Sequence, residues 1–239
     1  MKTKSFFYLL PLVFLFTCKN GSVSVLVFSK TAAFRHESIK YGKEAFLKLG
    51  KTYNINVDTT EDASKFTDLN LKRYKAIVFL STTGDVLNND QQAAFERFIK
   101  KGNGFVGVHA ASDCEYEWPW FVSLVGGNFN GHPAVQTADL HLTNTEHVST
   151  KMLPLIWQRT DEWYNFRNLN PKTNVLIKID EKSYQGGEHG VENTHPMCWY
   201  HAFDGGRAWY TALGHTNESY SEDLFLKHLV GGVKYAIGE

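Results

Sequence analysis

Short apolar segments rich in β-branched residues alternate with helical patterns through the first half of the chain, and this alternation restricts the fold most strongly. The strand-like segments are 22–29, 76–80 and 104–108, with a shorter alternating segment at 53–57. Continuous apolar runs are typical of parallel strands that are buried on both faces. Together with the short connections, they predict a right-handed parallel sheet covered by helices on both sides.

Two helices are predicted between these strands from apolar residues at helical spacing. The first spans His36–Leu49 and is expected to end at Gly50. The second spans Asn88–Lys101, with an asparagine as N-cap and a glycine after its last residue. Segment 58–71 is polar and rich in turn residues, and we expect one helical turn after Asp62.

The second half of the chain contains further strand-like segments with few helices between them. Asp204–Arg207 has the sequence of a hairpin turn, and Ser221–Ile237 has the pattern of an amphipathic helix. No linker marks a domain boundary. The sequence therefore predicts one α/β domain, a doubly wound parallel sheet with an antiparallel β extension. The strand-like segments of this half are 138–142, 155–157, 175–179, 197–200 and 207–213.

The first 17 residues have the pattern of a secretory signal. Two lysines precede an apolar segment, Phe6–Phe16, that is too short to span a membrane. Leu15–Cys18 has the Leu and Cys of a bacterial lipoprotein signal. We therefore expect removal of residues 1–17 and a lipid anchor on Cys18, in the periplasm or outer membrane of a bacterium. Plain secretion with cleavage nearby is the alternative.

Composition restricts the partners and the cross-links of the mature chain. The 239 residues include 25 Lys and Arg and 25 Asp and Glu, a balance that argues against nucleic acid as the main partner, since nucleic acids require a dense basic surface. Loss of residues 1–17 removes two lysines and leaves a net charge of −2. Cys114 and Cys198 could form a disulfide in an oxidising compartment, but two buried thiols is the interpretation that we favour.

Several polar residues, above all histidines, follow predicted strands directly. His36 lies in the loop after the first strand, and His109 follows strand 104–108. Ligands of open parallel sheets bind at the carboxyl ends of the strands, and imidazole transfers protons or binds metal near neutral pH. His132, His215 and Asp161 come from segments expected at the same edge. The histidines least suited by position are His141, His147, His189 and His228.

No local motif assigns the chemistry. The sequence has no Walker pattern, no GxGxxG after the first strand, and neither HExxH nor a CxxC pair. A metal held by dispersed His, Asp and Glu side chains therefore stays open. Asp161 and Glu162 are adjacent carboxylates that point to opposite faces if they lie in a strand, so only one of them would reach a shared site.

Aromatic residues flank the polar positions. Trp118, Trp163 and Trp199 could stack on sugar rings, although aromatic side chains more often fill cores. We expect one pocket walled by Trp118 and Trp163. If zinc binds there, the nitrogens of at least two histidines should lie within roughly 4–5 Å of a common point. The polar residues expected around this pocket are His36, His109, His132, Asp161 and His215.

Several short blocks have the order and spacing of a known family. They are Phe34–Ser38, Gly104–Ala111, Gly126–Phe129 with His132–Pro133, Asp161–Glu162, Pro196 with Trp199, Gly206–Arg207 with Tyr210–Thr211, and Leu213–His215. This combination resembles the trehalose-utilisation (ThuA-like) family, over about residues 23–237, and implies a ThuA-like domain at 22–238. The resemblance implies a flavodoxin-like fold similar to that of class I glutamine amidotransferases.

The resemblance also implies what the chain does not do. In those amidotransferases a cysteine lies on the sharp turn after a strand, whereas here the equivalent turn presents His109 and Cys114 lies five residues further on. Amidotransferase chemistry is not expected, because it needs a thiolate nucleophile. The family is linked with trehalose and related disaccharides and with pathways through 3-keto sugars, which implies a substrate class and not a mechanism.

Two classes of function stay open. An enzyme would cleave, isomerise or hydrate a sugar derivative, with His109, Asp161 and Glu162 as catalytic residues. A binding module would hold a carbohydrate without turnover. In both cases the partner is a small carbohydrate, and a membrane is contacted only through the lipid anchor. The candidate substrate-binding residues are Arg35, His36, Ser38, Asp113, Trp118, Trp163 and Trp199, and the candidate ligands of a divalent metal such as zinc are His36, His132 and His215.

Overall fold

The computed structural model describes residues 22–187 and 195–239, so the predicted signal segment, Cys18 and His189 lie outside the described residues. The helices are α1 (Ser38–Tyr53), α2 (Asp68–Leu71), α3 (Asn89–Lys100), α4 (Pro119–Val125) and α5 (Asp223–Ile237), with 3-10 turns η1 (Ala63–Lys65), η2 (His109–Ser112), η3 (Glu181–Ser183) and η4 (Glu218–Ser221). The strands are β1 (Val23–Phe28), β2 (Ile55–Thr60), β3 (Ala76–Leu80), β4 (Gly104–Val108), β5 (Asn128–Phe129), β6 (Gln136–Leu142), β7 (Ile156–Asp161), β8 (Phe166–Arg167), β9 (Asn174–Ile179), β10 (Pro196–Phe203) and β11 (Gly206–Thr211).

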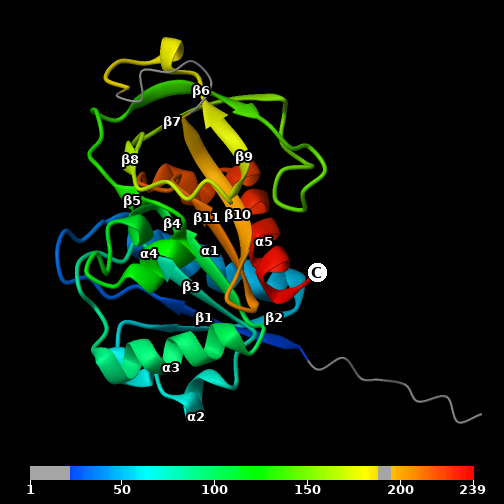
Figure 1. The fold of residues 1–239 in the computed structure, drawn as a ribbon. Coiled ribbons are helices and arrows are strands. Elements are labelled where there is room, and N and C mark those ends of the chain that lie inside the picture. The colour runs from blue at the N-terminus through cyan, green and yellow to red at the C-terminus, as the bar shows by residue number, and fades with distance from the viewer. Residues whose placement is uncertain (1–21, 188–194) are drawn as a thin grey trace, which may run out of the picture.

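A single large sheet runs through the described part of the chain. Its nine strands have the order β2-β1-β3-β4-β11-β10-β9-β6-β7, and β5 pairs separately with β8 (Figure 1). β1 pairs in parallel with β2 and β3, and β3 pairs in parallel with β4. Val25, Ile77 and Val106 therefore lie in parallel strands, and the predicted α/β fold with a parallel sheet is confirmed.

The antiparallel extension continues the same sheet instead of forming a separate unit. β10 pairs antiparallel with β9 and β11, and β6 pairs antiparallel with β7 and β9. The turn between β10 and β11 has positive φ at Asp204 (47°) and Gly205 (89°), the backbone of the predicted hairpin. β11 also pairs in parallel with β4, so the hairpin returns the chain to the parallel half.

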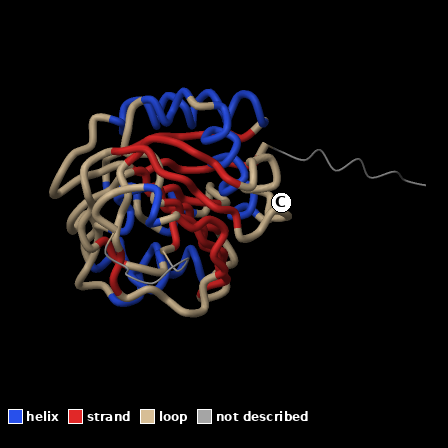
Figure 2. The backbone as a smooth tube through the Cα atoms, turned by 90° about the horizontal axis from the view of Figure 1, so that it is seen from above, coloured by secondary structure: helices blue, strands red, loops and turns tan. Residues whose placement is uncertain are grey.

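Helices cover both faces of the parallel strands (Figure 2). Phe79 of β3 stacks on Phe95 of α3, with ring centroids 5.4 Å apart. The next residue, Leu80, lies against Gly42 of α1. Because successive side chains of a strand point to opposite faces, α3 and α1 lie on opposite sides of the sheet. The carboxyl ends of the strands stay uncovered by these helices, and the loops that follow them form the site.

One predicted helix boundary is wrong. The helix expected to end at Gly50 continues to Tyr53 and ends at Asn54, which has a left-handed backbone with φ 56°. Gly50 serves close packing instead, because a Cβ there would lie 2.6 Å from the carbonyl oxygen of Ile55. A glycine in a helical pattern can mark either a helix end or a close approach, and the pattern alone does not separate them.

The structure also tests for a disulfide bond and for a membrane-spanning helix. Cys114 and Cys198 are both buried free thiols, so they form no disulfide with each other. No helix in the described ranges combines the length and the apolar character needed to cross a membrane.

Candidate functional site

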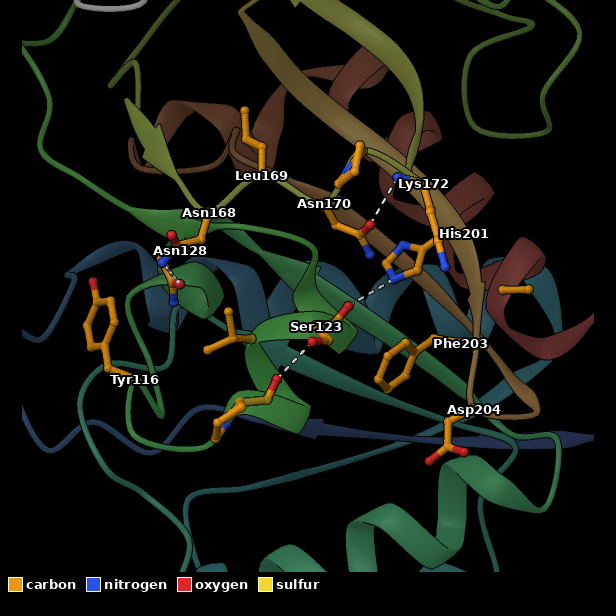
Figure 3. Close-up of a pocket in the computed structure, with 14 residues that line it drawn as sticks. Tyr116, Ser123, Asn128, Asn168, Leu169, Asn170, Lys172, His201, Phe203 and Asp204 are labelled. Carbon is orange, nitrogen blue, oxygen red and sulfur yellow. Dashed lines mark hydrogen bonds between the residues drawn. The ribbon is translucent and has the colours of Figure 1, made fainter.

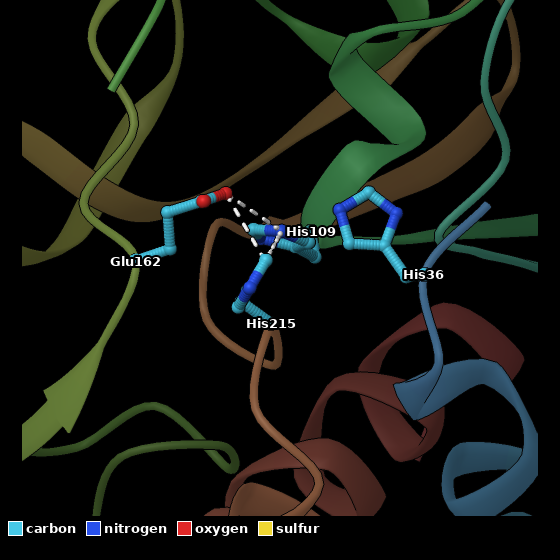
Figure 4. Close-up of side chains that lie close together, drawn as sticks. All are labelled: His36, His109, Glu162 and His215. Atoms are coloured by element: carbon cyan, nitrogen blue, oxygen red, sulfur yellow. Dashed lines mark hydrogen bonds and ion pairs between the residues drawn. The ribbon is translucent and has the colours of Figure 1, made fainter. Parts of the chain in front are cut away.

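Four side chains from distant parts of the chain meet at the carboxyl edge of the sheet (Figure 4). His109 follows β4, Glu162 follows β7, His215 lies beyond the end of β11, and His36 precedes α1. One ligand atom from each lies within 4.8 Å of those of the others. His36, His109 and Glu162 are buried, whereas the His215 side chain is 25% exposed. The group is therefore reachable from solvent on the His215 side.

His109 is held rigidly by the backbone around it. It has φ 51°, a left-handed conformation that is uncommon for a residue with a side chain, and it thus forms a sharp turn directly after β4. Its Nδ1–H donates to the carbonyl oxygen of Ala212 over 2.7 Å. The hydroxyl of Tyr210 donates to the His109 carbonyl oxygen over 2.8 Å. These bonds leave Nε2 of His109 as the atom that faces the group.

Glu162 lies between the imidazoles. Its Oε2 is 3.4 Å from Nε2 of His109 and 3.1 Å from Nδ1 of His215, and the two nitrogens are 3.3 Å apart. Burial alone would raise the pKa of Glu162, but hydrogen bonds and charge attraction from His109 and His215 outweigh it and hold this pKa well below its usual range. The Glu162 contacts in turn outweigh burial at His215 and raise its pKa. A carboxylate therefore sits among three imidazoles.

His36 supplies a neutral imidazole with an unused nitrogen. The residue is 5% exposed, and its buried Nδ1 has no hydrogen-bond partner. Burial, followed by repulsion from His109 and His215, lowers the pKa of His36 to about 3. A buried polar atom without a hydrogen-bond partner costs free energy. A metal ion that binds the lone pair of this nitrogen would remove that cost. Metal ions bind imidazole in this neutral form.

Asp161 does not reach the group, and the structure gives it a supporting position instead. It is fully buried, and it accepts hydrogen bonds from the backbone amides of Gly214 (2.8 Å) and His215 (3.0 Å). It also accepts from the Glu162 amide (3.0 Å) and the Ser219 hydroxyl (3.4 Å), and it pairs with Arg159 at 3.2 Å. Of the two adjacent carboxylates, only Glu162 belongs to the group, and it lies just after β7 instead of within a strand. Asp161, expected from the sequence as a catalytic residue, therefore lies outside the group and positions the His215 loop.

The other predicted polar residues lie at different distances from the group. His132 is outside the four, but its Nδ1 is 3.0 Å from Oε1 of Glu162 and its side chain is 40% exposed. Ser38 donates to the carbonyl oxygen of Gly214 over 3.3 Å and so supports the His215 loop. Asp113 accepts from the Tyr116 hydroxyl over 2.6 Å, and burial raises its pKa. Arg35 is exposed and bonds Glu61, away from the group.

Trp118 and Trp163, the expected walls of the pocket, do not line the cavity beside the group, so that expectation is wrong, and Trp199 does not line it either. Trp118 stacks on Trp120 and Phe121. The indoles of Trp163 and Trp199 donate to the carbonyl oxygens of Gln136 and Val125. All three rings are at least nine-tenths buried within the core, where their large apolar surface is removed from water.

Two aromatic neighbours of the group were missed. Tyr164 lies with its ring centroid 4.2 Å from that of His109, and Phe34 lies 4.8 Å from His36. Phe34 is two residues before His36 in the same loop, so the sequence could have identified it as a neighbour of His36. Of the histidines expected to lie elsewhere, His147 and His228 bond Ser149, and His141 is in β6 outside the group.

A cavity of about 370 Å³ opens beside the group and is lined by His36 and His215 among others. A larger cavity of about 830 Å³ lies between α4 and the segment 168–172 (Figure 3). Among the described residues, none of the predicted site residues lines the larger cavity. The smaller one is therefore the approach to the histidines.

Fold and site together define a class of protein. The chain has a flavodoxin-like α/β fold in which the turn after β4 carries a histidine instead of a nucleophilic cysteine. The family model described as "ThuA: Trehalose utilisation" matches residues 24–236. The chain belongs to this family, and its function is accordingly one in carbohydrate use related to trehalose.

Solved structures agree with this assignment. A ThuA-like protein from Bacteroides uniformis is 27% identical, with a TM-score of 0.75, 90% of this chain covered and 91% of that one. One from Parabacteroides merdae is 18% identical, with a TM-score of 0.76 and coverages of 91% and 90%. A GMP synthase subunit from Thermoplasma acidophilum shares the fold at 12% identity, with a TM-score of 0.53 and coverages of 90% and 96%. No curated protein matches the chain significantly.

Proposed function

We propose that this protein is a metal-dependent enzyme that processes trehalose-like disaccharides or their keto derivatives. A divalent transition metal such as zinc would be held by the four residues that meet at the sheet edge. The observation that carries the proposal is the spacing of their ligand atoms, 3.1, 3.3 and 3.4 Å for the three pairs among His109, Glu162 and His215. Ligand atoms of tetrahedral zinc are about 3.3 Å apart, given Zn–N distances of ~2.0–2.1 Å.

The donor and acceptor roles of His109 and Glu162 also support a cation between their facing atoms. Because Nδ1–H of His109 donates to Ala212, its Nε2 is an acceptor in the neutral ring, and it faces the acceptor oxygen of Glu162. Two acceptors in contact are stable only with a proton or a metal ion between them. The backbone bond at Nδ1 is also the outer contact that typically orients a histidine ligand.

In this proposal His109 and His132 exchange the roles that the sequence predicted for them, catalysis for His109 and metal binding for His132. His109 becomes a ligand, which occupies the nitrogen that proton transfer would need. His132 is the better proton carrier, since its Nδ1–H can donate to Glu162 (3.0 Å) and to the carbonyl of Pro133 (2.9 Å), which leaves Nε2 free to accept a proton. In a 3-keto sugar the carbon beside the carbonyl would give its proton to His132, and the electron pair would move onto the carbonyl oxygen. A bound divalent metal supplies charge stabilisation for that oxygen or an activated water.

Removal of the metal tests this proposal. Purified protein is expected to hold an equimolar divalent metal, measured by elemental analysis, and a chelator should abolish turnover of trehalose or 3-keto-trehalose and lower Tm. Zinc at about 100 times its Kd should restore ~2.7 kcal/mol of stability.

The His141→Gln variant is the matched control, because His141 lies outside the group. Absence of metal after incubation with zinc, manganese and cobalt would refute the metal centre. Sugar binding without turnover by the metal-loaded protein would instead favour the binding module.

We also propose that the mature protein is anchored by a lipid on Cys18. The support is the position of Cys18 directly after an apolar segment that itself follows two lysines. Cys18→Ser should move the protein from the membrane fraction to the soluble fraction, measured by fractionation and immunoblotting. A variant at Cys114, a buried thiol, is the control and should stay with membranes. Unchanged membrane association of the Cys18 variant is the result that contradicts the anchor.

A further inference from the structure

The cavity beside the histidines has an unusual combination of walls. It measures about 370 Å³, within the range of ~300–1,000 Å³ that small-molecule sites occupy. His36 and His215 form its inner end, and the unpartnered Nδ1 belongs to this His36. The rest of its lining comprises an aromatic ring, an aliphatic side chain, two carboxylates, a hydroxyl and an amide, which belong to Phe34, Val135, Glu37, Glu218, Thr216 and Asn217.

Phe34 is an exposed ring on a fixed backbone. Its exposure is 65%, which is high for a large apolar side chain, and Val135 is 44% exposed. The loop that carries it is tied to the chain after β3, where the amide of Ala32 donates to the carbonyl oxygen of Thr83 and the Thr83 hydroxyl donates to that of Phe34, both over 2.7 Å. The ring is thus presented to solvent at the mouth of a polar site without burying its own surface. Such a ring suits the apolar face of a sugar.

The charge at the mouth is negative. Glu37 and Glu218 contribute two carboxylates, and none of the described residues that line the cavity is a lysine or an arginine. Arg35, the nearest basic residue along the loop, is engaged by Glu61 at 2.9 and 3.1 Å. A carboxylate accepts hydrogen bonds from sugar hydroxyls but repels a phosphate or a second carboxylate.

We propose that this cavity selects a neutral, unphosphorylated sugar ring, which stacks on Phe34 and donates hydroxyls to Glu37 and Glu218. The inference rests on the proposed function and adds the charge of the substrate to it. A dication held by the histidines would attract an anionic group at the inner end. The two carboxylates act on the outer part of the substrate, where they disfavour an anionic substituent.

Two probes that differ by one phosphate test the selection. Trehalose and trehalose 6-phosphate are titrated calorimetrically into zinc-loaded protein. Trehalose is expected to bind at least about tenfold more tightly, and Phe34→Ala should weaken its binding by about tenfold. Phe34→Tyr keeps the ring and should bind trehalose as the unchanged protein does. Leu69→Ala removes a similarly exposed apolar side chain (72%) on α2 and should leave the affinity for both sugars unchanged. The Glu37→Gln, Glu218→Gln double variant should reduce the difference between the two sugars.

The outcomes separate this inference from the metal centre. Equal or tighter binding of trehalose 6-phosphate, unchanged trehalose binding by Phe34→Ala, or no binding of either sugar would each overturn the selection. Zinc affinity, measured on the same Phe34→Ala preparation, should stay unchanged. If zinc fails to bind but trehalose still binds in a Phe34-dependent manner, the metal centre is wrong and the selection stands.

Discussion

Replacing His109 with Gln is expected to abolish tight zinc binding. His109 Nε2 lies 3.3–3.4 Å from the ligand atoms of both His215 and Glu162, and its ring is fixed by the bond to Ala212. Loss of an outer contact of a metal ligand costs about 10–100-fold in affinity, and loss of the ligand itself should cost at least ~100-fold. Calorimetric titration of zinc into the metal-free variant gives the affinity, and turnover of the sugar probes gives the rate.

The same variant distinguishes an enzyme from a binding module. An enzyme should lose its rate while sugar binding changes little, whereas a binding module should lose affinity for the sugar. His141→Gln is the control for the loss of any one histidine. A His109→Gln protein that is folded by circular dichroism and binds zinc as tightly as the unchanged protein would exclude His109 as a ligand.

The largest effect on stability is expected from Asp161→Ala. The substitution removes one of the two carboxylates that pair with the buried Arg159, the other being Glu222 at 3.2 Å. It also removes the acceptor of the backbone amides of Glu162, Gly214 and His215. Breaking a buried ion pair by removing one partner costs about 3–5 kcal/mol. For a chain of this size that corresponds to a Tm lower by about 6–20 °C. Thermal and urea unfolding measure both quantities.

A surface ion pair provides the matched control. Glu61 bonds Arg35 and Lys43, and the side chains of all three are at least 30% exposed, so Glu61→Ala should cost about 0–1 kcal/mol. Asp161→Asn should lie between the two variants, because an amide oxygen in the place of Oδ1 still accepts from the backbone amides of Glu162 and His215. If Asp161→Ala unfolds no earlier than Glu61→Ala, the buried pair contributes nothing and our account of the His215 loop is wrong.

Local sequence patterns predicted helix ends and turns correctly where a pattern is compatible with only one structure. Asn88 caps α3 with a capping box, as its position before the apolar residues indicates, and the Asp204–Gly205 turn joins β10 to β11. Gly50 has two meanings, helix end or close packing, and only contact with Ile55 decides between them. The tryptophans were ambiguous in the same way, because a large ring serves a core and a sugar surface equally well.

The sequence by itself determined the parallel sheet and the edge at which polar residues collect, because both follow from local periodicity and from the rule that loops after parallel strands share one edge. It also singled out Asp161 and Glu162 as candidate carboxylates, although Glu162 lies just beyond β7, where strand alternation does not apply. It also placed His36, His109 and His215 around one pocket. Only the tertiary structure decided that Glu162 joins them within ligand distance and that Asp161 and His132 lie outside the group. The residues of the group are separated by dozens of positions in the chain, and their convergence depends on β11 returning beside β4 and on the outermost strand, β7, ending at the same edge. Strand order and register are set by packing between distant segments, which no local pattern records.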